Sequence, residues 1–166
     1  VILLSAFYFL LSVLVVQAAV LYLSPASGDF TVGGNFTVAV YVSSPDQAMN
    51  AVQGTVNFPP DRLEVISLSK SGSLPNLWVR EPSFSNVAGA IQFEKVYLNP
   101  GFTGSNGKIL LITFRGKQTG KASIGITDGL VLANDGLGTD ILTETKAGVY
   151  VIIPKKFNPS PATSTN

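Results

Sequence analysis

The sequence of 166 residues contains neither cysteine nor histidine. The absence of cysteine excludes disulfide bonds and thiolate nucleophiles, and the absence of histidine excludes Ser-His-Asp triads and zinc sites built on imidazole. Only oxygen ligands remain for a metal ion, and these suit hard cations such as calcium. Without disulfides, the stability of a folded chain must come from its apolar core.

Charged residues are also sparse, since they make up 13% of the chain and leave a net charge of +1. A nucleic-acid-binding protein needs clustered Lys and Arg to neutralise several phosphates, and the sequence has no such cluster. The acidic residues accompany no nucleophile motif. Glu64, Glu94 and Glu144 fall on or beside predicted strands, where a solvent-facing carboxylate is ordinary. We therefore expect a protein that is not an enzyme.

The beginning of the chain differs from the rest because it carries no charge before Asp29. Its apolar run before Gln17 has the length of the hydrophobic region of a secretory signal peptide, and small residues follow directly. We expect a signal peptide over residues 1–19, removed after Ala18 or Ala19, and hence a secreted or cell-surface protein. An uncleaved membrane anchor is the alternative, because roughly 20 apolar residues can span a bilayer.

Short segments rich in Val, Ile, Thr and Phe follow this leader, and Gly, Pro, Asn or Asp interrupts them at the spacing of a β-sandwich. In most segments apolar and polar residues alternate, as they do from Phe36 to Val42, which predicts strands with one buried face. We count roughly nine such strands and, outside the leader, no helical periodicity. Leu77, Trp78 and Phe84 lie among prolines and serines, so residues 71–89 are predicted to form a loop.

One strand, residues 108–117, has apolar residues on both faces. Leu110, Ile112 and Phe114 form one face, while Ile109 and Leu111 fall on the opposite face. This pattern predicts a strand that is covered on both sides.

The end of the sequence, PKKFNPSPATSTN, is rich in Pro, Ser and Thr. Such a composition is typical of a solvated linker. The predicted organisation is therefore a leader over residues 1–19, one sandwich domain over residues 20–153 and a linker over residues 154–166.

The segment VLANDGLGTDIL, residues 131–142, combines glycines with side chains that carry oxygen ligands. Calcium could be held by Asn134, Asp135, Thr139 and Asp140. The spacing does not match an EF-hand loop, however, and Asn, Asp and Gly also serve as turn residues with a left-handed backbone. We favour a structural turn, keep calcium as the weaker alternative, and expect no other cofactor.

Five segments, in this order, resemble the cohesin domain. They are LYLSPASGDFTVGGNFTVAVYV, AVQGTVNFPPDRLEV, NPGFTG, GKILLITFRGKQTGKASIGI and VLANDGLGTDIL. The resemblance covers nearly all of residues 20–153 and is strongest to single cohesin-like domains of bacterial surface and secreted proteins. It implies an all-β, nine-stranded jelly-roll sandwich, a fold shared with carbohydrate-binding modules.

The resemblance also implies a function. Cohesins are non-catalytic receptors that bind calcium-loaded dockerin modules and so assemble polysaccharide-degrading enzymes on a scaffold. By analogy, the chain is an extracellular module that binds a dockerin-like protein or carbohydrate through one flat sheet face. The residues expected on that face are Gln53, Thr55, Asn57, Gln92, Glu94, Ile109, Leu111 and Thr113.

Two alternatives remain open at this point. A direct carbohydrate-binding module would expose a row of aromatic side chains for stacking on sugars. Such a row could come from Tyr41, Trp78, Phe84, Tyr97 and Phe102 if several of them share a face. The other alternative is a structural or adhesive spacer in a longer cell-envelope protein, which would bind no partner.

The leader makes a first testable prediction. Because the small residues after the apolar run suit signal peptidase, exported protein should begin at Ala19 or Val20. Intact-mass measurement of exported material checks this, and a mass that still includes Val1 would show an uncleaved anchor.

Overall fold

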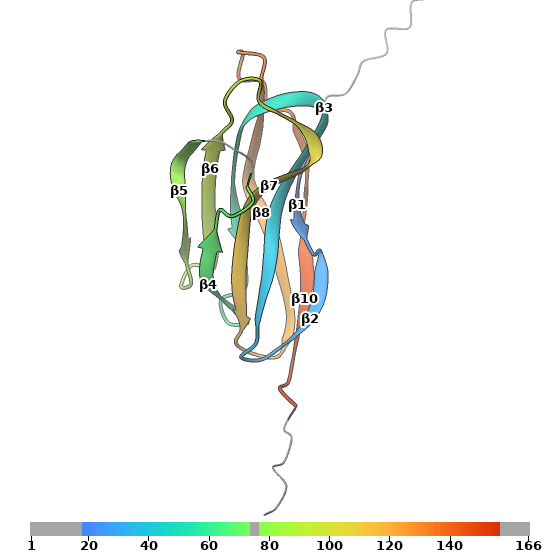
Figure 1. The fold of residues 1–166 in the computed structure, drawn as a ribbon. Coiled ribbons are helices and arrows are strands. Elements are labelled where there is room, and N and C mark those ends of the chain that lie inside the picture. Colours follow the sequence, from blue (N-terminus) through green and yellow to red (C-terminus); the bar gives the residue numbers. More distant parts are fainter. Residues whose placement is uncertain (1–17, 74–76, 157–166) are drawn as a thin grey trace, which may run out of the picture.

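The computed structural model describes residues 18–73 and 77–156, and these residues form ten β-strands (Figure 1). The strands are β1 (Ala19–Ser24), β2 (Ser27–Thr31), β3 (Asn35–Asn57), β4 (Leu63–Ser69), β5 (Leu77–Ser85), β6 (Ala90–Val96), β7 (Phe102–Gly116), β8 (Gly120–Ala133), β9 (Leu142–Lys146) and β10 (Gly148–Ile153). Within this described part, no helix has the length and apolarity needed to cross a membrane. The predicted leader lies outside the described residues except for Ala18 and Ala19, and so does the predicted linker after Lys156.

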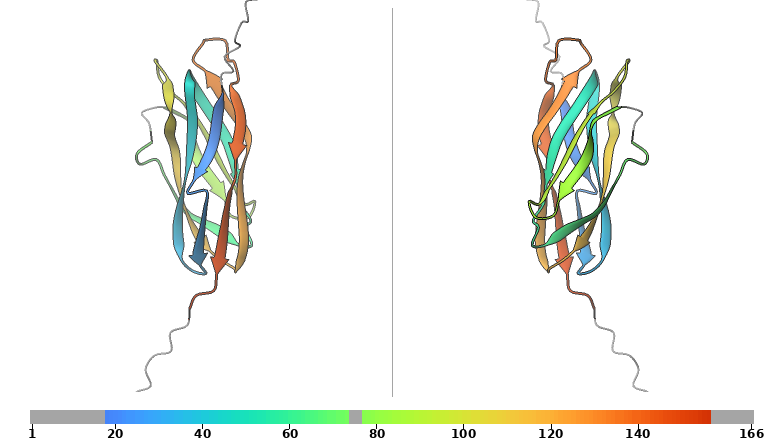
Figure 2. Two further views of the ribbon diagram at one scale, coloured as in Figure 1. Left: turned by 90° about the vertical axis from the view of Figure 1, so that its right-hand side faces the viewer. Right: turned by 90° about the vertical axis from the view of Figure 1, so that its left-hand side faces the viewer.

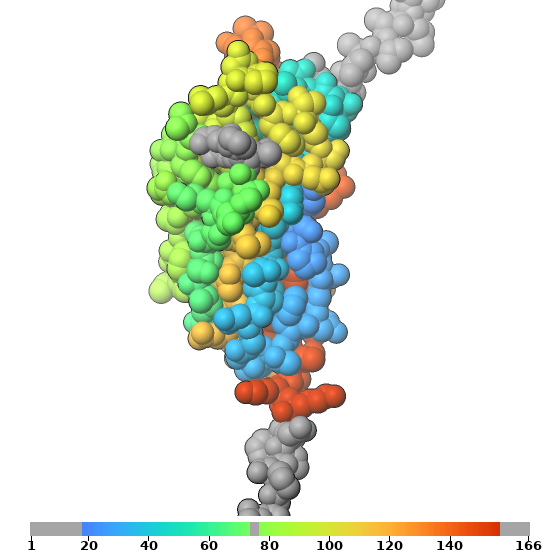
Figure 3. Space-filling model, in the orientation of Figure 1, coloured from blue at the N-terminus to red at the C-terminus, as the bar shows by residue number. Residues whose placement is uncertain are grey.

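The strands form two layers, and the long strand β3 belongs to both. Its first half pairs antiparallel with β1 and β7, and its second half pairs antiparallel with β6 and β8. The first layer therefore runs β4-β7-β3-β1-β9, and the second runs β5-β6-β3-β8-β10-β2. The chain enters at one end of this elongated sandwich and leaves at the other (Figure 2). Atoms of β1, β3 and β7 lie side by side in the space-filling view (Figure 3).

The core lies between the two layers and follows the period-two pattern of the sequence. Phe36, Val38, Val40 and Val42 are all buried, as their alternation predicts, because successive side chains of a strand point to opposite faces. At one end the core is aromatic: Phe36 stacks on Phe30 and on Phe114, with ring centroids 3.9 and 5.7 Å apart. The predicted all-β sandwich is thus confirmed.

The loop predicted for residues 71–89 is wrong in part, because Leu77–Ser85 forms β5. This strand pairs with β6 at the edge of the second layer, and its register shifts twice, between Trp78 and Arg80 and between Arg80 and Ser83. An edge strand tolerates a proline such as Pro82, since one side of its backbone needs no ladder partner. The local sequence therefore resembles a loop although the tertiary structure makes a strand.

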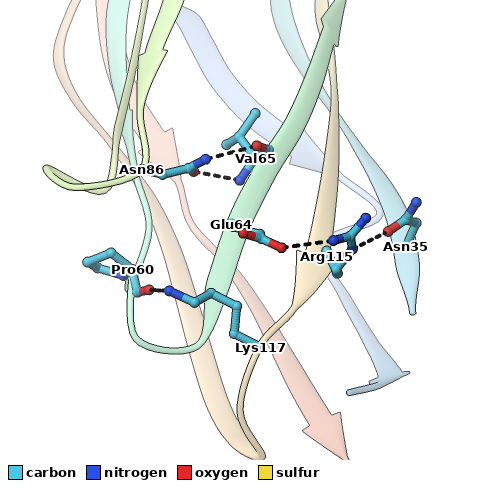
Figure 4. A network of polar contacts seen from close by, with 7 residues as sticks. All are labelled: Asn35, Pro60, Glu64, Val65, Asn86, Arg115 and Lys117. Carbon is cyan, nitrogen blue, oxygen red and sulfur yellow. Dashed lines mark hydrogen bonds and ion pairs between the residues drawn. The ribbon is translucent and has the colours of Figure 1, made fainter. Parts of the chain in front are cut away.

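One asparagine connects the two layers. Asn86 lies in the turn between β5 and β6, yet its side chain reaches β4 in the other layer (Figure 4). Its Oδ1 accepts a hydrogen bond of 2.7 Å from the Val65 N–H, and its Nδ2 donates one of 3.0 Å to the Val65 carbonyl. The Asn86 amide thus makes the two hydrogen bonds to Val65 that the backbone of a neighbouring strand would otherwise make.

We predict that Asn86→Ala lowers the free energy of unfolding by about 1–3 kcal/mol, because it leaves both polar groups of Val65 without their partner. The control is Arg115→Ala, which removes the exposed ion pair with Glu64 and should cost about 1 kcal/mol at most. Urea denaturation measures both. Equal stability of the two variants would contradict this role of Asn86.

Candidate protein-binding face

The strands β5, β6, the second half of β3 and β8 pair side by side, and we call their shared outer surface the candidate face. Gln53 lies opposite Glu94 on one side and Leu130 on the other. Thr55 lies opposite Gln92 and Thr127 in the same way. Since directly opposed residues of paired strands point to the same side of a sheet, these side chains share one surface.

One half of the candidate face is polar. A shallow hollow there is lined by Gln53, Thr55, Gln92, Glu94, Arg80 and Asp128 together with Gly54 and Phe93. Beside it, Asn57 Nδ2 donates a 2.8 Å hydrogen bond to Thr127 Oγ1, and this hydroxyl in turn donates to Asp128 Oδ2 at 3.2 Å. The polar half therefore presents amides, hydroxyls and charges of both signs.

The other half of the candidate face is apolar. A second hollow is bordered by Ala51, Val96, Leu130 and Leu132, and Gln53 and Glu94 separate it from the polar half. Leu77 of β5 lies opposite Val96 and is 56% exposed. An apolar centre beside hydrogen-bonding groups is the usual composition of a protein interface.

A bulge in β8 shapes the boundary between these halves. The register between β3 and β8 shifts opposite Gly54, where Asp128 and Gly129 together face this single residue, so β8 contains one extra residue. Asp128 takes a left-handed backbone with φ of 50°, a conformation that Asp adopts more readily than most residues. The bulge places Asp128 at the polar hollow, where Arg80 and Glu94 also lie.

The structure brings together five of the eight residues that the cohesin resemblance indicated. Gln53, Thr55, Asn57, Gln92 and Glu94 all lie on strands of the candidate face. Whether they bind a partner stays a prediction. Sequence reasoning missed Arg80, Asp128, Leu130 and Leu132, although the alternation from Leu130 to Leu132 could have shown two apolar residues on one side of a strand.

The other three residues are not on this face. Leu111 lies opposite Ala39, and Thr113 lies opposite Thr37, so both belong to the outer surface of the first layer. The expectation of one face containing all eight residues is therefore wrong. The reason is that β7 pairs with the first half of β3, whereas β6 pairs with its second half.

Ile109 is a separate correction, because it is fully buried in the core. Val40 pairs with Leu110 and Tyr41 pairs with Lys108, which leaves Ile109 as the extra residue of a bulge in β7. A bulge breaks the strict alternation of a strand. Ile109 and Leu110 can therefore both contact the core, and Ile109 contributes nothing to the outer surface.

Three of the five aromatic residues that could stack on sugars do not form an exposed row. Tyr97 is buried, and Trp78 lies over Lys95 on the inner side of β6. Tyr41 is in the first layer, where its ring stacks on Tyr22 with centroids 5.3 Å apart. These three rings therefore share no exposed platform.

In the segment 131–142, side-chain oxygens hydrogen-bond to the chain's own backbone. Asp135 Oδ1 accepts from the Leu137 N–H at 2.8 Å, and hydrogen bonds from Thr139 and Leu137 lower the Asp135 pKa. Asp140 Oδ1 accepts from the N–H groups of Leu142 and Val131 at 3.0 and 3.3 Å.

The amide of Asn134 in the same segment joins two neighbouring loops. Its Nδ2 donates to the Pro100 carbonyl at 2.8 Å and to Asn99 Oδ1 at 3.2 Å. Gly136 and Gly138 both have a φ of 73°, which glycine adopts without strain. This geometry supports a structural turn at Asn134, Asp135 and Asp140, and its independence of calcium stays a prediction.

Comparison with known proteins gives similar structures but no similar sequence. No family model matches the chain, and no curated protein matches it. A non-cellulosomal cohesin from the archaeon Archaeoglobus fulgidus is 15% identical, with a TM-score of 0.63 over 81% of this chain and 91% of that one. The type I cohesin of a Coh-OlpC–Doc435 cohesin–dockerin complex from Clostridium thermocellum is 13% identical, with a TM-score of 0.64 over 84% and 96%.

A third similar structure is the cohesin module of a family 33 glycoside hydrolase from Clostridium perfringens. It is 14% identical, with a TM-score of 0.60 over 76% of this chain and 91% of that one. Identities this low show the fold alone. The chain is thus a jelly-roll β-sandwich. Within that class its fold is similar to that of cohesins.

We predict that the melting temperature is the same in calcium and in chelator, because the turn is stabilised by its own hydrogen bonds. Asp140→Ala should lower stability by about 1 kcal/mol in both conditions, since two backbone N–H groups lose their acceptor. Thermal denaturation of both proteins measures this. A calcium-dependent rise in melting temperature that Asp140→Ala abolishes would show a calcium site instead.

Proposed function

We propose that the chain is a non-catalytic binding module whose candidate face docks a dockerin-like protein module. The observation that carries this function is the candidate face itself, in which an apolar patch and a set of hydrogen-bonding groups lie side by side on one sheet surface. Several of the structurally similar cohesins were solved in complex with dockerins, which supports a protein module as the partner.

The shape of the candidate face favours a protein over a small molecule. Small-molecule sites are concave and bury most of the ligand. The candidate face is instead an open sheet, with Leu77 exposed and Leu130 and Leu132 half-buried. A partner that covers these leucines removes apolar surface from water, and the amides of Gln53 and Gln92 can set its orientation.

The position of the chain ends is compatible with docking. The described chain enters and leaves the sandwich at its two opposite ends, so neither end crosses the candidate face (Figure 2). A longer protein could therefore continue in both directions while this face stays free. Because of the predicted leader, we place the module outside the cell. Because cohesins take part in polysaccharide breakdown, we associate the module with the same process.

Two threonines of β3 give a matched test, because Thr55 lies on the candidate face and Thr37 lies on the outer surface of the first layer. We expect calcium-loaded dockerin modules, tested as a panel by calorimetry, to include one that binds the wild type. Thr55→Glu should weaken this binding by about tenfold or more, because it buries an unpaired charge in the interface. Thr37→Glu should leave the affinity unchanged.

The same proteins separate the alternatives. Equal weakening by Thr37→Glu and Thr55→Glu would place the binding surface elsewhere. Retention on insoluble cellulose or chitin without dockerin binding would show a carbohydrate-binding module. A chain that binds neither the dockerin panel nor these polysaccharides would be a spacer.

A further inference from the structure

Lys95 is a buried lysine that packs against the aromatic rings of Trp78 and Tyr97 beside the apolar core. It lies near the end of β6, and its side chain points inward between Phe93 and Tyr97 in the alternation of that strand. Within residues 18–73 and 77–156, its Nζ has neither a hydrogen bond nor an ion pair to a protein group. A buried ammonium ion without a partner is strongly unfavourable, so this residue needs a physical account.

Two aromatic rings surround the amine. Nζ lies 4.7 Å from the ring centroid of Trp78, which is the residue directly opposite Lys95 on β5, and 5.1 Å from that of Tyr97. The π faces of these rings attract an ammonium ion, but they replace only part of the hydration that it loses on burial. The two rings therefore offset part of the free-energy cost of burying the ammonium ion, but they do not cancel it.

Among the residues that the structure describes, no carboxylate forms an ion pair with Lys95. Glu94 and Arg80, the nearest charged residues on β6 and β5, point to the outer face and line its polar hollow. Glu81 on β5 pairs with Lys70 at 2.8 Å. The phenol of Tyr97 lies on the same side of β6 as Lys95, and burial raises its pKa, so Tyr97 stays neutral where Lys95 titrates.

The strand that covers Lys95 is weakly held. β5 forms its ladder with β6 alone, that ladder is interrupted by two register shifts, and most residues of β5 are exposed. Local opening concentrates in such edge elements, because few apolar contacts must be broken to separate them. Moving β5 away from β6 would remove Trp78 from Lys95 and give the amine access to water.

We propose that the protonation state of Lys95 controls how readily β5 separates from β6. The ammonium form of Lys95 favours separation of β5, and loss of the proton favours the paired state. Because β5 carries Leu77 and Arg80, loosening also alters the edge of the candidate face. The proposal does not depend on which partner, if any, that face binds.

The direction of the pH effect follows from the burial of the amine, which lowers the pKa of Lys95 to about 8. When β5 opens, the amine regains the ordinary lysine pKa of about 10.4, so the open state binds more protons between these two values. The equilibrium constant for opening should therefore fall with rising pH in this window, by up to about tenfold for each pH unit. Below about pH 8 both states are protonated, and the constant should be flat.

The chain contains its own reporter, because Trp78 is the only tryptophan. Tryptophan fluorescence and its quenching by acrylamide are recorded from about pH 6.5 to about pH 11.5, a range that includes both pKa values. We expect the fluorescence to change with a midpoint of about 8, and quenching to decrease above that pH. Quenching that is flat over the whole range, or a fluorescence midpoint at the ordinary lysine pKa, would overturn the proposal.

Three variants identify the titrating group. Lys95→Met has a similar length and no charge, so it should be more stable than the wild type and show no transition. Lys95→Arg cannot lose its proton in this range, so quenching should stay high at every pH. Lys121→Met changes an exposed lysine of β8 and should keep the wild-type transition. Persistence of the transition in Lys95→Met, or its loss in Lys121→Met, would assign it to another group.

Discussion

The pairing of one long strand with four others is the constraint on which the structure depends. β3 binds β1 and β7 through its first half and β6 and β8 through its second half, so it fixes the position of both layers at once. Gly54 shows how tight this arrangement is, because a Cβ at that position would lie 2.8 Å from the Phe93 ring. A chain without disulfides thus obtains its two-layer geometry from the four ladders of β3 and from the core between the layers.

The same constraint decides which residues can act together. The second half of β3 lies between β6 and β8, so polar groups from three strands meet at Gln53 and Thr55. The bulge at Asp128 and the edge strand β5 then add charge and apolar surface to this face. In the interior below this face, two buried polar atoms lack a hydrogen-bond partner in the described structure. They are Nζ of Lys95 and the hydroxyl oxygen of Tyr97. The candidate face thus lies above a part of the interior that contains a buried amine and a buried phenol.

Sequence reasoning succeeded where burial is local and periodic. The alternation from Phe36 to Val42 predicted which side chains are buried, because every second residue of a strand faces the same side. It failed at Ile109, where a bulge breaks the alternation, and at Leu77–Ser85, where pairing with β6 makes a strand out of a loop-like sequence. Five residues of the candidate face were named correctly as neighbours, but Leu111 and Thr113 were assigned to the wrong layer.

The sequence by itself determined that this protein is an all-β sandwich, because hydrophobic periodicity and turn residues act over a few neighbouring positions. It also determined the available chemistry, since the absence of cysteine and histidine is a property of composition. Only the tertiary structure decided which strands lie side by side, that β3 passes from one layer to the other, and that Lys95 is buried under Trp78. Those features depend on hydrogen bonds and packing between residues far apart in the chain, and no local pattern encodes such contacts.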